Sequence, residues 1–128
     1  MARILIAEDD DSMRHFLSRA LERAGHDVVS VGHGVEALAV IAEGRFDLLL
    51  ADIVMPEMDG IELAQRAAET DRNIRVIFIT GFAGVALNRP HGERAQAKVL
   101  SKPFHLRELV SEVDRALAAR VSEGIRPL

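Results

Sequence analysis

Five side chains of the kinds used in phosphate chemistry stand at the ends of short apolar runs. The carboxylates of Glu8 and Asp9 follow the first run, and that of Asp52 follows a later one. Thr80 and Lys102 close two further runs and offer a hydroxyl and an ammonium group. If these positions meet, neighbouring carboxylates raise one another's pKa unless a cation joins them. The pattern therefore predicts a site that holds a cation.

The ligand types favour Mg²⁺ over zinc, because carboxylate oxygens are hard ligands and the chain has no cysteine. Mg²⁺ usually completes its coordination shell with water and phosphate oxygens. Lys102 then offers a compact charge to one phosphoryl oxygen, and Thr80 offers a hydroxyl donor to another. Asp52 is the expected nucleophile, since carboxylates form aspartyl-phosphate intermediates. The irregular turn at Met55 and Pro56 is expected to keep Asp52 accessible.

The elements that must position these residues alternate along the chain. Near-continuous apolar runs are typical of strands buried on both faces; they occupy residues 4–7, 48–51, 76–79 and 99–100, with a more polar run at 27–31. Helical spacing of apolar residues follows each run, at 13–24, 35–43, 58–69, 82–87 and 106–117. The prediction is a doubly wound α/β fold, a (βα)5 sandwich with a five-stranded parallel sheet of order 2-1-3-4-5. That order brings the five side chains to one edge.

Composition narrows the class of protein. The chain has 128 residues, and its 16 basic and 20 acidic residues give a net charge of −4. This length suits one domain with its own core, and the charge argues against nucleic acid or an anionic membrane as partner. No apolar stretch approaches the roughly 18 residues of a membrane span, and the first run is too short for a signal peptide. We therefore expect a soluble, cytoplasmic protein.

Some polar residues are expected to have structural roles or to lie away from the site. Asp10 or Asp11 is expected to cap the first helix, which leaves Glu8 and Asp9 for the metal. The histidines share no spacing typical of a zinc site, so we expect surface or loop placement for those at positions 15, 26, 33, 91 and 105.

These positions, spread over nearly the whole chain, resemble the receiver domain of two-component response regulators. The matching segments are an acidic pair, an aspartate with the loop after it, a hydroxyl and a lysine-proline pair: Glu8-Asp9, residues 52–60, Thr80 and Lys102-Pro103. The resemblance implies a flavodoxin-like or receiver-like sheet. It also implies a signalling module rather than an enzyme that turns over a substrate.

The resemblance implies a role for each residue. Asp52 would accept a phosphoryl group from a histidine kinase or a histidine phosphotransfer protein. The Mg²⁺ ligands would be Glu8, Asp9, Asp52 and the backbone carbonyl of Val54. Thr80 and Lys102 would contact the phosphoryl oxygens.

Three segments, residues 55–64, 78–83 and 97–106, are similar to those of stand-alone CpdR-type receivers of alphaproteobacterial cell-cycle circuits. In that group a histidine phosphotransfer protein supplies the phosphoryl group, and the unphosphorylated receiver is an adaptor that primes a ClpXP-type protease. The similarity implies a single-domain response regulator in a phosphorelay, whose phosphorylation switches a protein–protein interaction. We expect a receiver domain over residues 1–119 and a short C-terminal tail over 120–128, with no output domain.

One position departs from the family pattern. Many receivers carry a tyrosine or phenylalanine three residues before the lysine, where its rotamer reports phosphorylation, but this chain has Val99 there. Phe82 and Phe104 are candidate substitutes, because each lies within two residues of a site loop. We also expect a short fourth helix in the glycine-containing segment 81–90, which phosphorylation reorganises.

Two other classes of protein share parts of the pattern. A small metal-dependent phosphatase or phosphotransferase also forms an aspartyl phosphate, and it stays as the alternative hypothesis. Such enzymes typically place an acidic proton donor two residues after the nucleophile, where this chain has Val54. A flavodoxin-like FMN-binding protein shares the sheet order, but the four acidic residues at 8–11 would repel its phosphate.

Overall fold

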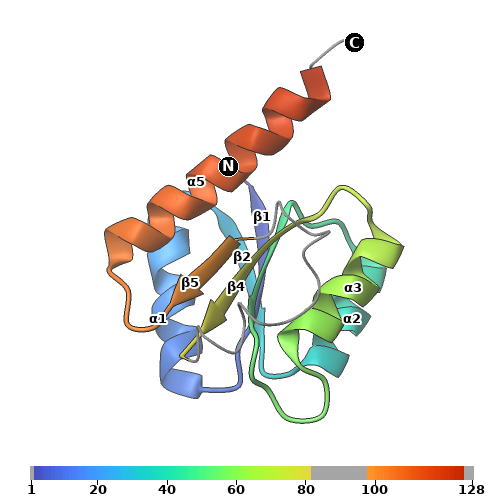
Figure 1. Cartoon of the computed structure of the whole chain (residues 1–128), viewed down its shortest axis with the longest axis vertical. Coiled ribbons are helices and arrows are strands. Elements are labelled where there is room, and N and C mark those ends of the chain that lie inside the picture. The colour runs from blue at the N-terminus through green and yellow to red at the C-terminus, as the bar shows by residue number, and fades with distance from the viewer. Residues whose placement is uncertain (1, 82–97, 126–128) are drawn as a thin grey trace.

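Five parallel strands form the middle layer of the protein (Figure 1), within residues 2–81 and 98–125, which the computed structural model describes. The strands are β1 (Arg3–Ala7), β2 (Asp27–Val31), β3 (Leu48–Asp52), β4 (Arg75–Thr80) and β5 (Lys98–Ser101). Their order, β2-β1-β3-β4-β5, confirms the predicted topology. Because every pairing is parallel, all five strands end at the same edge of the sheet.

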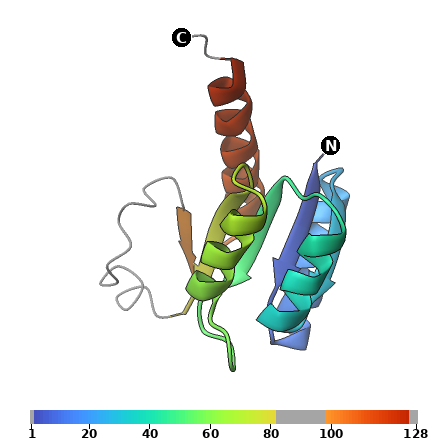
Figure 2. The ribbon, with the colours of Figure 1, turned by 90° about the vertical axis from the view of Figure 1, so that its right-hand side faces the viewer.

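Helices cover both faces of the sheet. They are α1 (Asp11–Arg23), α2 (Gly34–Glu43), α3 (Gly60–Thr70) and α5 (Leu106–Ile125). Figure 1 shows α1 and α5 on one side of the sheet and α2 and α3 on the other, and Figure 2 looks onto the α2 and α3 side. The predicted fourth helix at 82–87 and nearly all of the expected switching segment at 81–90 lie outside the described residues.

Alternating strand residues supply two separate cores. Every residue of β3 is buried. Leu48 and Leu50 pack with α1 and α5, whereas Leu49 and Ala51 pack with α2 and α3. A large aliphatic side chain removed from water contributes about 1.5–3 kcal/mol. The apolar runs therefore have to be strands in the middle layer, and this fixes where their polar last residues emerge.

Aspartate caps set where two helices begin. The Asp10 side chain accepts a hydrogen bond from the Met13 backbone N–H at 2.9 Å, as predicted for the first helix. Asp59 accepts one from the Glu62 N–H at 2.8 Å, so α3 begins at Gly60. The predicted start at residue 58 is wrong, because Met58 is buried in the loop before the cap.

Two features away from the site bear on the sequence predictions. The helix α5 continues to Ile125, beyond the predicted helix end at residue 117, and its last turns project past the sheet (Figures 1 and 2). His26 lies in the loop between α1 and β2, as expected, although its side chain is only 8% exposed. Its Nδ1 accepts a hydrogen bond from the Ala2 N–H at 3.2 Å. Among the described residues, no helix is long and apolar enough to cross a membrane.

Candidate functional site

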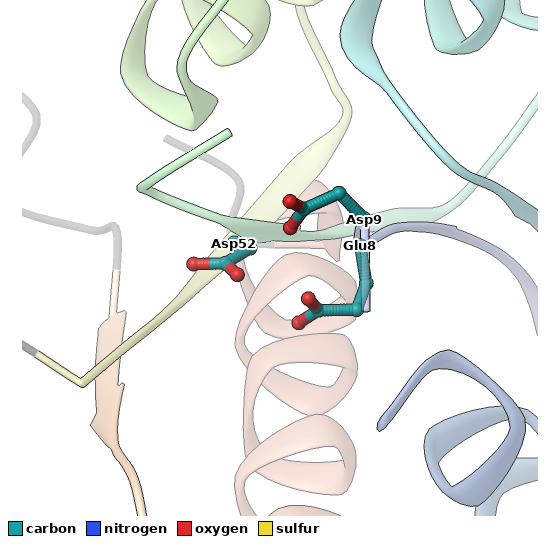
Figure 3. A group of neighbouring side chains, drawn as sticks. All are labelled: Glu8, Asp9 and Asp52. Atoms are coloured by element: carbon teal, nitrogen blue, oxygen red, sulfur yellow. The ribbon is translucent and has the colours of Figure 1, made fainter. Parts of the chain in front are cut away.

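Three carboxyl groups converge at the C-terminal edge of the sheet. Ala7 of β1 pairs with Ala51 of β3, so the residues that follow them lie at the same edge of the sheet. These residues are Glu8 and Asp52, and Asp9 follows Glu8; Figure 3 shows the carboxyl groups of Glu8 and Asp9 extending toward the side where Asp52 lies. One oxygen from each lies within 4.8 Å of the others. The structure thus brings together the three acidic residues identified in the sequence.

The ammonium group of Lys102 faces two of these carboxylates. Its Nζ lies 3.4 Å from Glu8 Oε1 and 3.4 Å from Asp52 Oδ2. Both distances are long for a charged hydrogen bond, so the contacts are chiefly electrostatic. The backbone N–H of Lys102 donates to the Thr80 carbonyl at 2.8 Å, which holds the turn after β5 against the end of β4. A cis peptide bond joins Lys102 to Pro103.

Burial divides the three acids. Glu8 is fully buried and Asp52 is 5% exposed, whereas Asp9 is exposed. Burial raises the pKa of Glu8 from its ordinary 4.5 to about 7, and the nearby Asp52 charge adds to this increase, while the Asp10 N–H and Lys102 oppose it. Burial alone would lower the pKa of Lys102, but the charges of Asp52 and Glu8 outweigh it and raise that pKa.

The predicted accessibility of Asp52 is wrong. The loop after β3 returns to the end of that strand: Gly60 N–H donates to the Ile53 carbonyl at 2.9 Å, and Val54 N–H donates to Asp52 Oδ1 at 3.1 Å. Met55, expected to hold the turn open, is itself buried. The Asp52 side chain keeps 7% of its area exposed to solvent.

Gly60 is a site residue that sequence reasoning did not single out. A Cβ at this position would lie 2.3 Å from the backbone oxygen of Asp52, closer than side chains are found to backbone atoms. Only glycine therefore fits without a shift of the backbone that carries Asp52. The residue type was visible in the sequence, but the close approach depends on how the loop folds.

The remaining predicted residues take different places. Thr80 is buried at the end of β4, beside β5, and Val54 is 51% exposed. Val99 packs with the core under α2 and α3. Phe104 is partly buried against the other core, and the second aromatic candidate, Phe82, lies outside the described residues.

The charge balance of the site suits a divalent cation. When ionised, Glu8, Asp9 and Asp52 carry three negative charges against the single positive charge of Lys102. The donors are carboxylate oxygens, which fit Mg²⁺. A buried acid with a pKa near 7 is the expected state of such a site before a cation binds.

Known proteins resemble the chain along nearly its whole length. Residues 4–114 match the family model described as the response regulator receiver domain. The response regulator receiver protein CpdR of Brucella abortus (strain 2308) is 57% identical over 119 residues, which are 93% of this chain and 99% of that protein.

Solved structures share the fold. The receiver domain of the hybrid histidine kinase CckA superposes with a TM-score of 0.78 at 32% identity, covering 90% of this chain and 98% of that one. The response regulator TrrA of Thermotoga maritima, in complex with Mg²⁺-BeF, gives a TM-score of 0.81 at 27% identity, covering 91% and 99%.

Proposed function

The chain belongs to the response regulator receiver family, and from that premise we propose that Asp52 accepts a phosphoryl group in a two-component phosphorelay. Phosphorylation then switches a protein–protein interaction. One observation carries the proposal: Lys102 Nζ lies 3.4 Å from both Glu8 Oε1 and Asp52 Oδ2. A positive charge is thereby fixed beside the nucleophile, at the place where phosphoryl oxygens arrive.

The metal in this proposal is Mg²⁺. Glu8, Asp9 and Asp52 would hold it, with the backbone carbonyl of Val54. When bound, Mg²⁺ neutralises charge on the phosphoryl oxygens. The related TrrA structure holds Mg²⁺ together with BeF, a mimic of a phosphoryl group, and this supports the same ligand class here.

The chain's own residues account for the transfer. A carboxylate oxygen of Asp52 attacks phosphorus, an O–P bond forms, and the bond from phosphorus to the donor's histidine nitrogen breaks, so that the imidazole leaves. Lys102 stabilises the charge on the transferring oxygens, and the Thr80 hydroxyl donates to one of them. Beside the nucleophile, Val54 supplies a backbone N–H and an apolar side chain, neither of which transfers protons as a phosphatase requires.

Beryllofluoride binding tests this assignment. With Mg²⁺ and beryllofluoride present, amide resonances of Asp52, Thr80 and Lys102 should shift in the wild type. They should not shift in Asp52→Asn, which keeps the shape of the side chain but loses its charge. Equal shifts in both proteins would place the acceptor elsewhere and overturn the proposal.

The finer proposal is a CpdR-like role. A histidine kinase or histidine phosphotransfer protein would supply the phosphoryl group, and the unphosphorylated protein would act as an adaptor for a ClpXP-type protease in cell-cycle control. Identity of 57% over 99% of Brucella CpdR supports this role. In this proposal residues 1–119 are the receiver and residues 120–128 are a tail, in a protein that works in the cytoplasm.

A pull-down tests the adaptor role. Immobilised wild-type protein, with and without Mg²⁺ and beryllofluoride, is offered purified ClpX. The proposal expects capture by the unmodified protein and at least severalfold less capture with beryllofluoride. Capture that does not depend on beryllofluoride, or no capture in either state, would contradict the adaptor role and leave the phosphoryl-acceptor role untouched.

A further inference from the structure

The loop that carries Glu8 and Asp9 is held at both ends by one side chain. Arg14 is the fourth residue of α1, and its Nη1 donates to the backbone carbonyl of Glu8 at 2.8 Å. Its Nη2 donates to Asp11 Oδ1 at 2.5 Å. The two branches of the guanidinium group therefore join the end of β1 to the start of α1, across the loop.

The surroundings of Arg14 keep it in this position. Its side chain is only 24% exposed, although it belongs to a helix at the surface. A Cβ on Gly32, in the loop after β2, would lie 3.5 Å from Nη1, so the guanidinium group fits between two loops. An ordered guanidinium with two acceptors is better suited to fixing a backbone than a freely moving surface charge.

The carbonyl that Arg14 binds belongs to the peptide joining Glu8 to Asp9. Fixing that carbonyl fixes the plane of the peptide, and with it the direction in which the Asp9 side chain leaves the backbone. Packing constrains the buried Glu8 and Asp52, but Asp9 is exposed. Asp9 therefore depends more than the other two acids on the hydrogen bond to the loop.

We propose that Arg14 is a positioning residue for the cation site, acting through the backbone of Glu8 and Asp9. This inference rests on the proposed Mg²⁺ site. Residues that orient metal ligands typically contribute about 10–100-fold to metal affinity. Lysine would not replace Arg14. The planar guanidinium group of arginine reaches the Glu8 carbonyl and the Asp11 carboxylate at the same time, whereas a single ammonium group does not reach both.

Charge and positioning predict opposite results for Arg14→Met. Removing a positive charge near an acidic site should by itself tighten Mg²⁺ binding. Loss of positioning should weaken it, and we expect the Mg²⁺ dissociation constant to rise about tenfold. The matched control is Arg19→Met, which removes the same charge from an exposed position further along α1 and should leave that constant unchanged.

Isothermal titration of Mg²⁺ into the whole chain measures the effect. Phosphorylation by acetyl phosphate is followed as a function of Mg²⁺: the half-saturating concentration should rise about tenfold while the rate at saturation stays the same, a split that a general loss of fold would not give. Unchanged or tighter binding by Arg14→Met overturns the inference. Failure of the wild type to bind Mg²⁺ would instead contradict the proposed function, and the inference with it.

A second variant keeps the test valid if Arg14→Met folds poorly. Arg14→Lys retains the charge, and we expect severalfold weaker Mg²⁺ binding; binding equal to that of the wild type would overturn the inference. Hydrogen exchange adds a readout without metal. The Asp10 N–H, which donates to Glu8 Oε2 at 3.0 Å, should exchange faster in both Arg14 variants than in Arg19→Met, and equal exchange would count against the inference.

Discussion

The two edges of the sheet carry charged groups at the same spacing but in different surroundings. At the N-terminal edge, Arg3 Nε lies 3.4 Å from Asp27 Oδ2, with side chains 43% and 62% exposed. At the C-terminal edge, Lys102 lies 3.4 Å from Glu8 and from Asp52, whose side chains are 1% and 7% exposed. Solvent screens the first pair, whereas the carboxylates of the second group are buried and, when ionised, outnumber the single positive charge of Lys102. Distance alone therefore does not distinguish a structural ion pair from the site that we propose holds a cation.

The guanidinium group of Arg3 at the N-terminal edge has closer partners than the ammonium group of Lys102 at the C-terminal edge. Arg3 Nη1 donates to the Arg45 carbonyl at 3.1 Å, and the guanidinium group lies 4.6 Å from the centre of the Phe46 ring. Lys102 has only long contacts to its carboxylates. The first arrangement braces the fold, and in the proposed function the second leaves the ammonium group available to an incoming phosphoryl group.

Removing the cation of the C-terminal edge should have the largest effect. We expect Lys102→Met to slow phosphorylation by acetyl phosphate at saturating Mg²⁺ by about 10²–10³-fold, because the developing charge loses its partner. Lys98→Met is the matched control: Lys98 opens the same strand, is 53% exposed and lies 3.9 Å from Glu112. A time course of intact mass measures both rates. A loss of less than threefold in Lys102→Met would contradict the assigned role.

A glycine at each edge can be changed to alanine to compare how well its neighbours accommodate an added methyl group. At Gly60 the Cβ would meet the Asp52 backbone oxygen at 2.3 Å, and at Gly44 it would meet Nη1 of Arg3, the end of a long side chain, at 2.9 Å. We expect Gly60→Ala to lower the free energy of unfolding by about 2 kcal/mol, and Gly44→Ala to change it by less than about 0.5 kcal/mol. Urea unfolding measures both. Equal losses in the free energy of unfolding would mean that the backbone at Asp52 adjusts to the added methyl group as readily as the Arg3 side chain does.

Raising the pH should lower the stability that Glu8 contributes in the absence of Mg²⁺, and it should increase the affinity for Mg²⁺. Because burial raises the pKa of Glu8 from 4.5 to about 7, its protonated form adds stability that is fully present below pH 4.5 and lost as pH rises through 7. Mg²⁺ binds the ionised form, so its affinity should be about tenfold weaker at pH 6 than at pH 8. Calorimetric titration at both pH values measures this difference. Equal affinities would show that Glu8 is already ionised at pH 6.

The smallest effect is expected at the N-terminal edge. Asp27→Asn removes the exposed partner of Arg3 and should lower the free energy of unfolding by less than about 1 kcal/mol. The rate of phosphorylation should not change, since Asp27 begins the strand whose other end faces the site. Urea unfolding together with the intact-mass time course checks both expectations, and slower phosphorylation would show that the two edges are coupled.

The sheet could be predicted because its residues leave little choice. An uninterrupted run such as that of β3 is buried on both faces, and parallel connection then fixes the shared edge; the strand order 2-1-3-4-5 is a common one for such sheets. Helix starts were less certain. Met58 continues the apolar spacing of α3, but Asp59 caps the helix and excludes it. Apolar spacing indicates a helix face, whereas the capping hydrogen bond decides where the helix begins.

The site could be predicted as a set of residues but not as a shape. The convergence of Glu8, Asp9 and Asp52 follows from the shared edge. The burial of Asp52 and the close approach of Gly60 follow from the path of the loop after β3, which residue types alone do not define. The hydrogen bond from Arg14 to the Glu8 carbonyl escaped prediction for the same reason, because it joins a side chain to a backbone group.

Intact-mass spectrometry of wild type and Asp52→Ala tests the central claim most directly. Each protein is incubated with acetyl phosphate, with Mg²⁺ and with Mg²⁺ removed by a chelator. The account predicts one phosphoryl adduct on the wild type with Mg²⁺, and none on Asp52→Ala or without the metal. An adduct of equal yield on Asp52→Ala, or one independent of Mg²⁺, would contradict it.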